Sequence, residues 1–154
     1  MNDPDPTLPM AHPPISSSSD MRSRDTLLQR GAFDPPAAPG TLGRLDRFEI
    51  LRLIGEGGMG QVYLAREPLT DTQVAGKGMK PSLAGDPQSV HRFLTEARHM
   101  YRLAHPRILR VLEVSDRPGG PYYVMPYVEG GSLQGRYGPG APLPAAEILP
   151  VARQ

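Results

Sequence analysis

Three glycines and a lysine give the clearest chemical signal in the sequence. Gly55, Gly57 and Gly60 have the spacing G-x-G-x-x-G, Val62 follows two residues later, and Lys77 lies further along the chain. Glycine has no Cβ atom, so such a segment can bring backbone N–H groups close to a phosphate. Lysine supplies a compact cation, and only two of the 17 basic residues are lysines. The pattern predicts a phosphate-binding loop with a cation reserved for it.

The segments on either side of the glycines decide how the loop is interpreted. Residues 48–54 and 61–66 are rich in β-branched and aromatic side chains, which favours strands. No amphipathic helix follows the glycines for about 25 residues, so a dinucleotide-binding βαβ unit lacks its helix. No Gly-Lys-Ser/Thr sequence closes the loop, which excludes a Walker-type phosphate loop. The glycines are expected to join two strands, although an ordinary turn has the same spacing.

Composition limits the class of protein. The chain has 154 residues, which is room for about one domain. It has no stretch of 18 apolar residues that could span a membrane, and its N-terminus lacks the basic and apolar regions of a signal peptide. There is no cysteine, and the net charge of +1 gives no reason to expect nucleic acid or an anionic membrane as a partner. A cytoplasmic protein is expected.

Residues 1–43 are dense in Pro, Ser, Gly and Asp. Such a segment cannot bury enough apolar surface to offset its ordering entropy, so we expect a disordered extension with at most a helical turn over 20–31. A docking or phosphorylated tail is the functional alternative.

Four further elements are predicted after the glycine loop. Residues 72–80 form a strand weakened by Gly76 and Gly78, and residues 108–114 and 122–125 form two more. Between them, Asp86-Pro87 is a helix start signal, and the helix ends before His105-Pro106. Its apolar face is expected to carry Val90, Phe93, Leu94, Ala97, Tyr101 and Ala104.

Glu96 lies at the margin of that apolar face and is the only acidic residue from 90 to 104. A carboxylate in a partly buried position requires a cationic partner, and Lys77 is the candidate. None of the four histidines has a second histidine or a carboxylate at a spacing that indicates a metal site, so no metal is expected.

Together, in this order and spacing, the motifs resemble the small ATP-binding lobe of bacterial protein kinases of the eukaryotic serine/threonine type. The resemblance runs from about residue 45 to residue 133, and it includes the glycine loop, Val74-Ala75-x-Lys77, Glu96 on its helix, His105-Pro106-x-Ile108 and the segment 123–133. It implies an α+β fold, with a five-stranded antiparallel sheet and one principal helix. The implied organisation is an extension over 1–43, the lobe over 44–128, and the start of a helical lobe over 129–154.

The resemblance also implies roles for single residues. The glycine loop covers the triphosphate of ATP, and Lys77, held by Glu96, binds the α- and β-phosphates. Adenine lies under an apolar roof and against a hinge, where the Pro126 carbonyl accepts and the Val128 N–H donates a hydrogen bond. The nucleotide-binding residues expected in this way are Ile54, Gly55, Glu56, Gly57, Gly58, Met59, Gly60, Val62, Ala75, Lys77, Met125, Pro126 and Val128.

Two motifs of the resembled family are absent from the 154 residues: His-Arg-Asp-x-x-x-x-Asn and Asp-Phe-Gly. These supply the general base and the magnesium ligands, so magnesium and a protein substrate are expected only in a complete kinase. We expect this chain alone to be catalytically incompetent. The alternative hypothesis is a non-catalytic nucleotide-binding or interaction module, and a nicotinamide-cofactor enzyme is a third.

Overall fold

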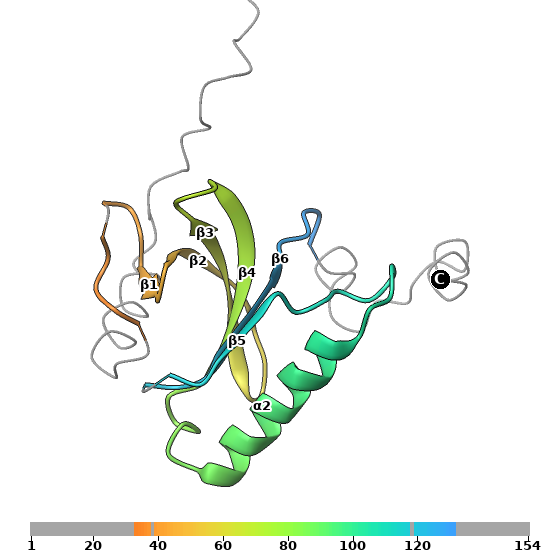
Figure 1. The fold of residues 1–154 in the computed structure, drawn as a ribbon. Helices are drawn as coiled ribbons and strands as arrows, with labels where there is room; N and C mark the ends of the chain where they lie inside the picture. The colour runs from red at the N-terminus through yellow and green to blue at the C-terminus, as the bar shows by residue number, and fades with distance from the viewer. Residues whose placement is uncertain (1–32, 38, 118, 132–154) are drawn as a thin grey trace, which may run out of the picture.

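The computed structural model describes residues 33–37, 39–117 and 119–131, and in these ranges one antiparallel sheet carries one helix across its face (Figure 1). The helix, α2, spans Pro87–Arg102. The strands lie side by side in the order β1-β2-β3-β4-β6-β5. Their bounds are β1 Gly43–Leu45, β2 Phe48–Glu56, β3 Gly60–Glu67, β4 Thr72–Met79, β5 Glu113–Ser115 and β6 Tyr122–Pro126. This is the predicted α+β architecture, with β1 as a sixth strand in addition to the five expected.

β3 and β4 pair along their whole length, from Gly60 opposite Met79 to Glu67 opposite Thr72. The strand over 72–80, which its glycines predict to be weak, is therefore fully paired with β3. Gly76 has no side chain to cover its part of the sheet, but the side chain of Leu45 does so instead. The Cδ1 atom of Leu45 lies 3.7 Å from the place where a Cβ of residue 76 would be.

Helix α2 begins as its sequence predicts. The carboxylate of Asp86 accepts hydrogen bonds from the backbone N–H groups of Gln88 and Ser89 at 3.2 and 3.0 Å, and Pro87 occupies the first turn. These contacts satisfy N–H groups that have no partner within the helix. The side chains that the helix buries are Phe93, Leu94 and Ala97.

The end of the helix differs from the expectation. α2 stops at Arg102, Ala104 lies beyond it and is exposed, and Tyr101 is 58% exposed. Leu103 caps the helix in an extended conformation, and a groove of about 540 Å³ lies between the last turns of α2 and β5, bordered by Tyr101 and Leu112. The apolar face therefore packs along the first three turns and opens at the last one.

The strand expected over 108–114 is also shorter and later, because β5 begins only at Glu113. Its register with β6 pairs Glu113 with Val124 and Ser115 with Tyr122. Continuing that register would place residue 111 opposite Pro126, which has no N–H to donate, so the ladder cannot extend that far upstream. Ile108 upstream is 44% exposed.

The sheet has one apolar cluster on each side. On the side that faces α2, called the helix face, the buried residues are Met79, Phe93, Ala97, Val111 and Tyr123. On the opposite side, called the outer face, they are Phe33, Leu42, Leu45, Phe48, Ile50, Tyr63, Ala65, Val74, Tyr122 and Val124.

The outer face is covered by residues that precede the expected start of the lobe at 44. Phe33 is 5% exposed and meets the ring of Tyr63 edge-on, with ring centroids 4.9 Å apart. Asp34 pairs its backbone with Arg44, and its carboxylate accepts two hydrogen bonds from Arg117 at 3.0 and 3.1 Å. The folded part therefore extends at least to residue 33, and residues 1–32 of the expected extension lie outside the described residues.

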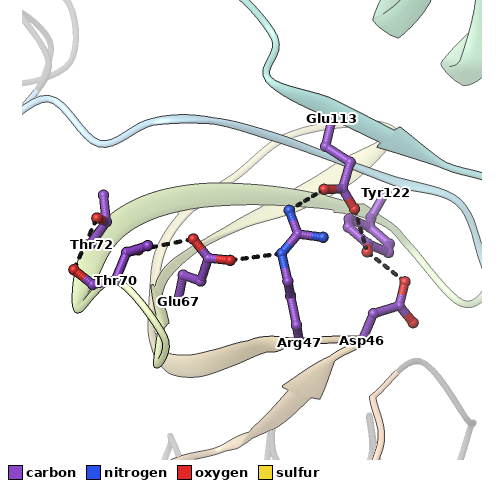
Figure 2. A network of polar contacts seen from close by, with 7 residues as sticks. All are labelled: Asp46, Arg47, Glu67, Thr70, Thr72, Glu113 and Tyr122. Carbon is purple, nitrogen blue, oxygen red and sulfur yellow. Dashed lines mark hydrogen bonds and ion pairs between the residues drawn. The ribbon is translucent and has the colours of Figure 1, made fainter.

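A polar network on the outer side ties the β1–β2 turn to two distant strands (Figure 2). The guanidinium of Arg47 donates to Glu67 at the end of β3 and to Glu113 at the start of β5. Next to it, the hydroxyl of Tyr122 donates to Asp46 at 2.6 Å. These contacts join residues up to 76 positions apart, and they fix the edge of the sheet relative to β3, β5 and β6.

Candidate functional site

The register of β4 gathers several of the predicted site residues on the helix face. Lys77 lies opposite Val62 of β3 on one side and opposite Tyr123 of β6 on the other. Ala75, two residues earlier on the same face, lies opposite Met125. The structure thus places Val62, Ala75, Lys77 and Met125 side by side.

Lys77 and Glu96 form an ion pair between β4 and α2. The Nζ atom of Lys77 lies 3.0 Å from Oε1 of Glu96, and the Lys77 side chain is 22% exposed. The ammonium group also lies 5.8 Å from the centre of the Phe93 ring. A cation held in this way is fixed in position but still has donor capacity for an anion.

Tyr123 is a further member of this group that sequence reasoning missed. Its hydroxyl donates to the same Oε1 atom of Glu96 at 3.1 Å, and the ring centre lies 5.4 Å from Lys77 Nζ. Burial raises the pKa of Tyr123, so the phenol stays protonated and acts as a donor. Burial opposes the charge of Lys77, but the contacts with Tyr123 and Glu96 outweigh it and raise the pKa of Lys77.

The glycine loop is held close to β4. The N–H of Gly57 donates to the carbonyl of Gly60 at 2.9 Å, which closes the loop. A Cβ added to Gly60 would lie 2.6 Å from the carbonyl oxygen of Gly78 and 3.5 Å from Cε of Lys77. Only glycine therefore fits at position 60, and this close approach puts the loop against the stem of Lys77.

Two ionisable side chains connect the loop with the end of β4. The Nζ atom of Lys80 lies 2.8 Å from Oε1 of Glu56. The backbone N–H of Lys80 also donates to the carbonyl of Met59 at 3.1 Å. Glu56 and Met59 are predicted loop residues, whereas no role of Lys80 is predictable from the sequence, because the contact depends on how far the loop folds over β4.

The remaining predicted residues lie at the edges of this region. Ile54 and Gly55 lie just before Glu56, the last residue of β2, and Gly55 is opposite Val62. Pro126 ends β6 opposite Val74, and Val128 follows the strand with 63% of its surface exposed.

The described residues contain no group of three His, Cys, Asp or Glu side chains placed to hold a metal ion. A cavity of about 670 Å³ lies elsewhere, between the start of α2 and the β5–β6 connection, where Ala84, Val90 and Gly120 line it. It contains none of the predicted site residues.

From β2 onward, the chain matches the sequence pattern of a known protein family. A model of the protein kinase domain matches residues 48–154, which is more than half of the chain. The chain belongs to the protein kinase family. The match begins at the first residue of β2 and includes the glycine loop, Lys77 and Glu96.

The relatives are bacterial serine/threonine kinases. PknD of Chlamydia pneumoniae is 42% identical over 90 residues, which are 58% of this chain and 10% of PknD. The DNA damage-responsive kinase RqkA of Deinococcus radiodurans is 42% identical over 121 residues, 76% of this chain and 18% of RqkA. This kinase-family chain therefore spans less than a fifth of either relative.

Solved structures give the same result for the fold. The kinase domain of PknI from Mycobacterium tuberculosis superposes with a TM-score of 0.56 and 30% identity, over 70% of this chain and 44% of that domain. These matches confirm the resemblance to the N-terminal lobe of bacterial kinases of the eukaryotic type. In the described part of this kinase-family chain, no helix has the length and apolarity needed to cross a bilayer.

Proposed function

We propose that this chain supplies the ATP-binding lobe of a serine/threonine protein kinase. The observation that carries the proposal is the ion pair of Lys77 and Glu96, with 3.0 Å between Nζ and Oε1, on the sheet face that also bears Val62 and Ala75. The loop residue Gly60 lies against Lys77. A fixed cation beside a glycine loop suits a polyphosphate ligand.

Each part of the site has a role in this proposal. Lys77 binds the α- and β-phosphates, and Glu96 and Tyr123 keep its ammonium group in place. The glycine loop covers the phosphates and binds them through backbone N–H groups other than that of Gly57, which already donates to the carbonyl of Gly60. The adenine ring lies against Val62 and Ala75, whose side chains are apolar and lie next to each other on β3 and β4.

At the edge of the site, Met125 closes the back of the adenine pocket. The carbonyl of Pro126 accepts a hydrogen bond from the adenine amino group, and the N–H of Val128 donates one to the ring. Proline suits position 126 because only its carbonyl is needed. Since the ligand is ATP, we propose a cytoplasmic location.

In a complete kinase, the terminal phosphoryl group leaves the β-phosphate oxygen of magnesium-bound ATP and bonds to a serine or threonine hydroxyl, whose proton passes to a general base. The residues described above bind and orient the nucleotide for that step. Among them, none is placed to take the proton, so the contribution of this lobe is positioning and electrostatic stabilisation.

The test is a thermal unfolding titration of the full 154-residue chain with ATP. ATP is expected to raise the unfolding midpoint, because a ligand that binds only the folded state stabilises it, and NAD is expected to have no effect. Lys77→Met is expected to reduce the ATP shift, whereas Arg98→Met, which removes an exposed cation on α2, leaves it unchanged. Equal shifts with ATP and NAD, or no ATP shift in the wild-type chain, would overturn the proposal.

A further inference from the structure

The glycine loop has contacts on the outer side of the sheet as well as on the helix face. Opposite residues on paired strands point to the same side. Gly55 pairs with Val62, which is on the helix face, and the next pair, Glu56 with Gln61, therefore points to the outer face. The side chain of Glu56 is directed away from the face on which Lys77 and Ala75 lie.

Lys80 attaches to this loop at two points. Its ammonium group lies 2.8 Å from Oε1 of Glu56, at the start of the loop. Its backbone N–H donates to the carbonyl of Met59, near the tip of the loop. Lys80, the residue immediately after β4, thus holds both the beginning and the tip of a glycine-rich segment that is otherwise costly to order.

The negative charge of Glu56 explains why a cationic partner matters at this position. A carboxylate in a loop that covers a triphosphate repels the ligand unless a cation neutralises it. The hydrogen bond from Lys80 lowers the pKa of Glu56, so the carboxylate is ionised and paired at neutral pH. Lys80 is also one of only two lysines in the sequence, the other being Lys77.

The base of the loop is anchored from the same side. Gln61, opposite Glu56, accepts a hydrogen bond from the hydroxyl of Tyr63 at 2.8 Å. Tyr63 is 2% exposed and packs against Phe33. On the outer face, Glu56 is therefore linked through Gln61 and Tyr63 to the buried cluster, which supports this end of the loop.

We propose that Glu56 and Lys80 form a latch that positions the glycine loop for nucleotide binding from the outer face of the sheet. The inference rests on the proposed ATP binding of the helix face. Both residues act through the loop backbone, without contact with the phosphates, and are positioning residues. The latch pre-orders the loop, so that less conformational freedom is lost when ATP binds.

The test measures ATP affinity by titration calorimetry for Glu56→Gln, Lys80→Met, the double variant and Lys80→Arg. Each single substitution is expected to weaken ATP binding about two- to five-fold, the range for an exposed ion pair. The double variant is expected to be no weaker than either single one, because both remove the same contact. Lys80→Arg retains the charge and is expected to keep the wild-type affinity.

Adenosine is the control ligand, because it has no phosphates under the loop, and its affinity is expected to be the same in all five proteins. A merely structural role would instead weaken adenosine and ATP alike. Tighter ATP binding by Glu56→Gln together with weaker binding by Lys80→Met indicates direct action on the phosphates and overturns the latch. Wild-type affinity in both single variants overturns it as well. A wild-type chain that binds no ATP overturns the proposed function along with the latch.

Discussion

The ammonium nitrogen of Lys77 lies 3.0 Å from Oε1 of Glu96, although the two residues are 19 positions apart on different elements. β4 carries the first and α2 the second, so the pair exists only when the helix is packed on the sheet. Tyr123 donates to the same carboxylate oxygen from β6. β4, α2 and β6 thus meet at the carboxylate of Glu96. Its contacts form only when all three elements are packed together on the helix face.

The hydroxyl of Tyr123 is expected to contribute measurably to that assembly. Tyr123→Phe removes one hydrogen bond to an ionised carboxylate and leaves the ring in place, so the free energy of unfolding should fall by about 1–2 kcal/mol. Urea denaturation measures it. Tyr127→Phe is the matched control, because among the described residues the Tyr127 hydroxyl has only a long contact of 3.5 Å with Arg52. Equal stability of the two variants would contradict the assigned role of Tyr123.

Gly60 and Gly58 should respond differently to the same substitution. A Cβ at position 60 would lie 2.6 Å from the carbonyl oxygen of Gly78, whereas one at position 58 meets no heavy atom of the described part of the chain within 4 Å. Gly60→Ala is expected to cost about 1–3 kcal/mol of stability, because the backbone must move. Gly58→Ala should change it by less than about 0.5 kcal/mol. Thermal or urea unfolding of both variants measures these changes in stability. A Gly60→Ala variant as stable as the wild-type chain would show that the loop is not held against β4.

Phe33 should behave as a core residue. It is 5% exposed and packs on Tyr63, so Phe33→Ala is expected to lower the free energy of unfolding by about 3–5 kcal/mol. Leu69→Ala is the control, because Leu69 is 91% exposed and its truncation should have almost no effect. Similar unfolding curves for Phe33→Ala and the wild-type chain would mean that the N-terminal segment does not cover the outer face.

The contact between Asp34 and Arg117 predicts that the free energy of unfolding depends on pH. Hydrogen bonds from Arg117 hold the pKa of Asp34 below its ordinary value of 3.8. A carboxylate whose pKa is lower in the folded state stabilises that state above the unfolded pKa, and the contribution disappears as the pH falls through the folded pKa. The stability difference between wild type and Asp34→Asn should therefore be constant from pH 7 to about 5 and shrink below about 4. Urea denaturation over that range measures it, and a difference that grows on acidification would contradict the assignment.

The sequence predicts this site where the signal is local. The glycine spacing, the strands beside it and the start of α2 depend on residues within one or two turns of each other, and all appear as expected. Lys77 and Glu96 are predicted as partners because a carboxylate at the edge of an apolar helix face needs a cation. Which cation lies within reach is settled only by the packing of α2 on β4.

The features that the sequence does not predict depend on long-range register. Tyr123 reads as an ordinary strand residue until the pairing of β6 with β4 places it opposite Lys77. Phe33 stands alone in a proline-rich segment, where one apolar side chain has no periodicity. The start of β5 depends on where Pro126 falls in the facing strand.

The central role proposed for Lys77 is recognition of the phosphates of a nucleotide. Titration calorimetry of wild type and Lys77→Met with ATP and with adenosine tests it most directly. Loss of a charge-assisted contact is expected to weaken ATP binding by at least about ten-fold, while adenosine binds both proteins equally. Equal ATP affinity in the two proteins, or a parallel loss for ATP and adenosine, would contradict the claim.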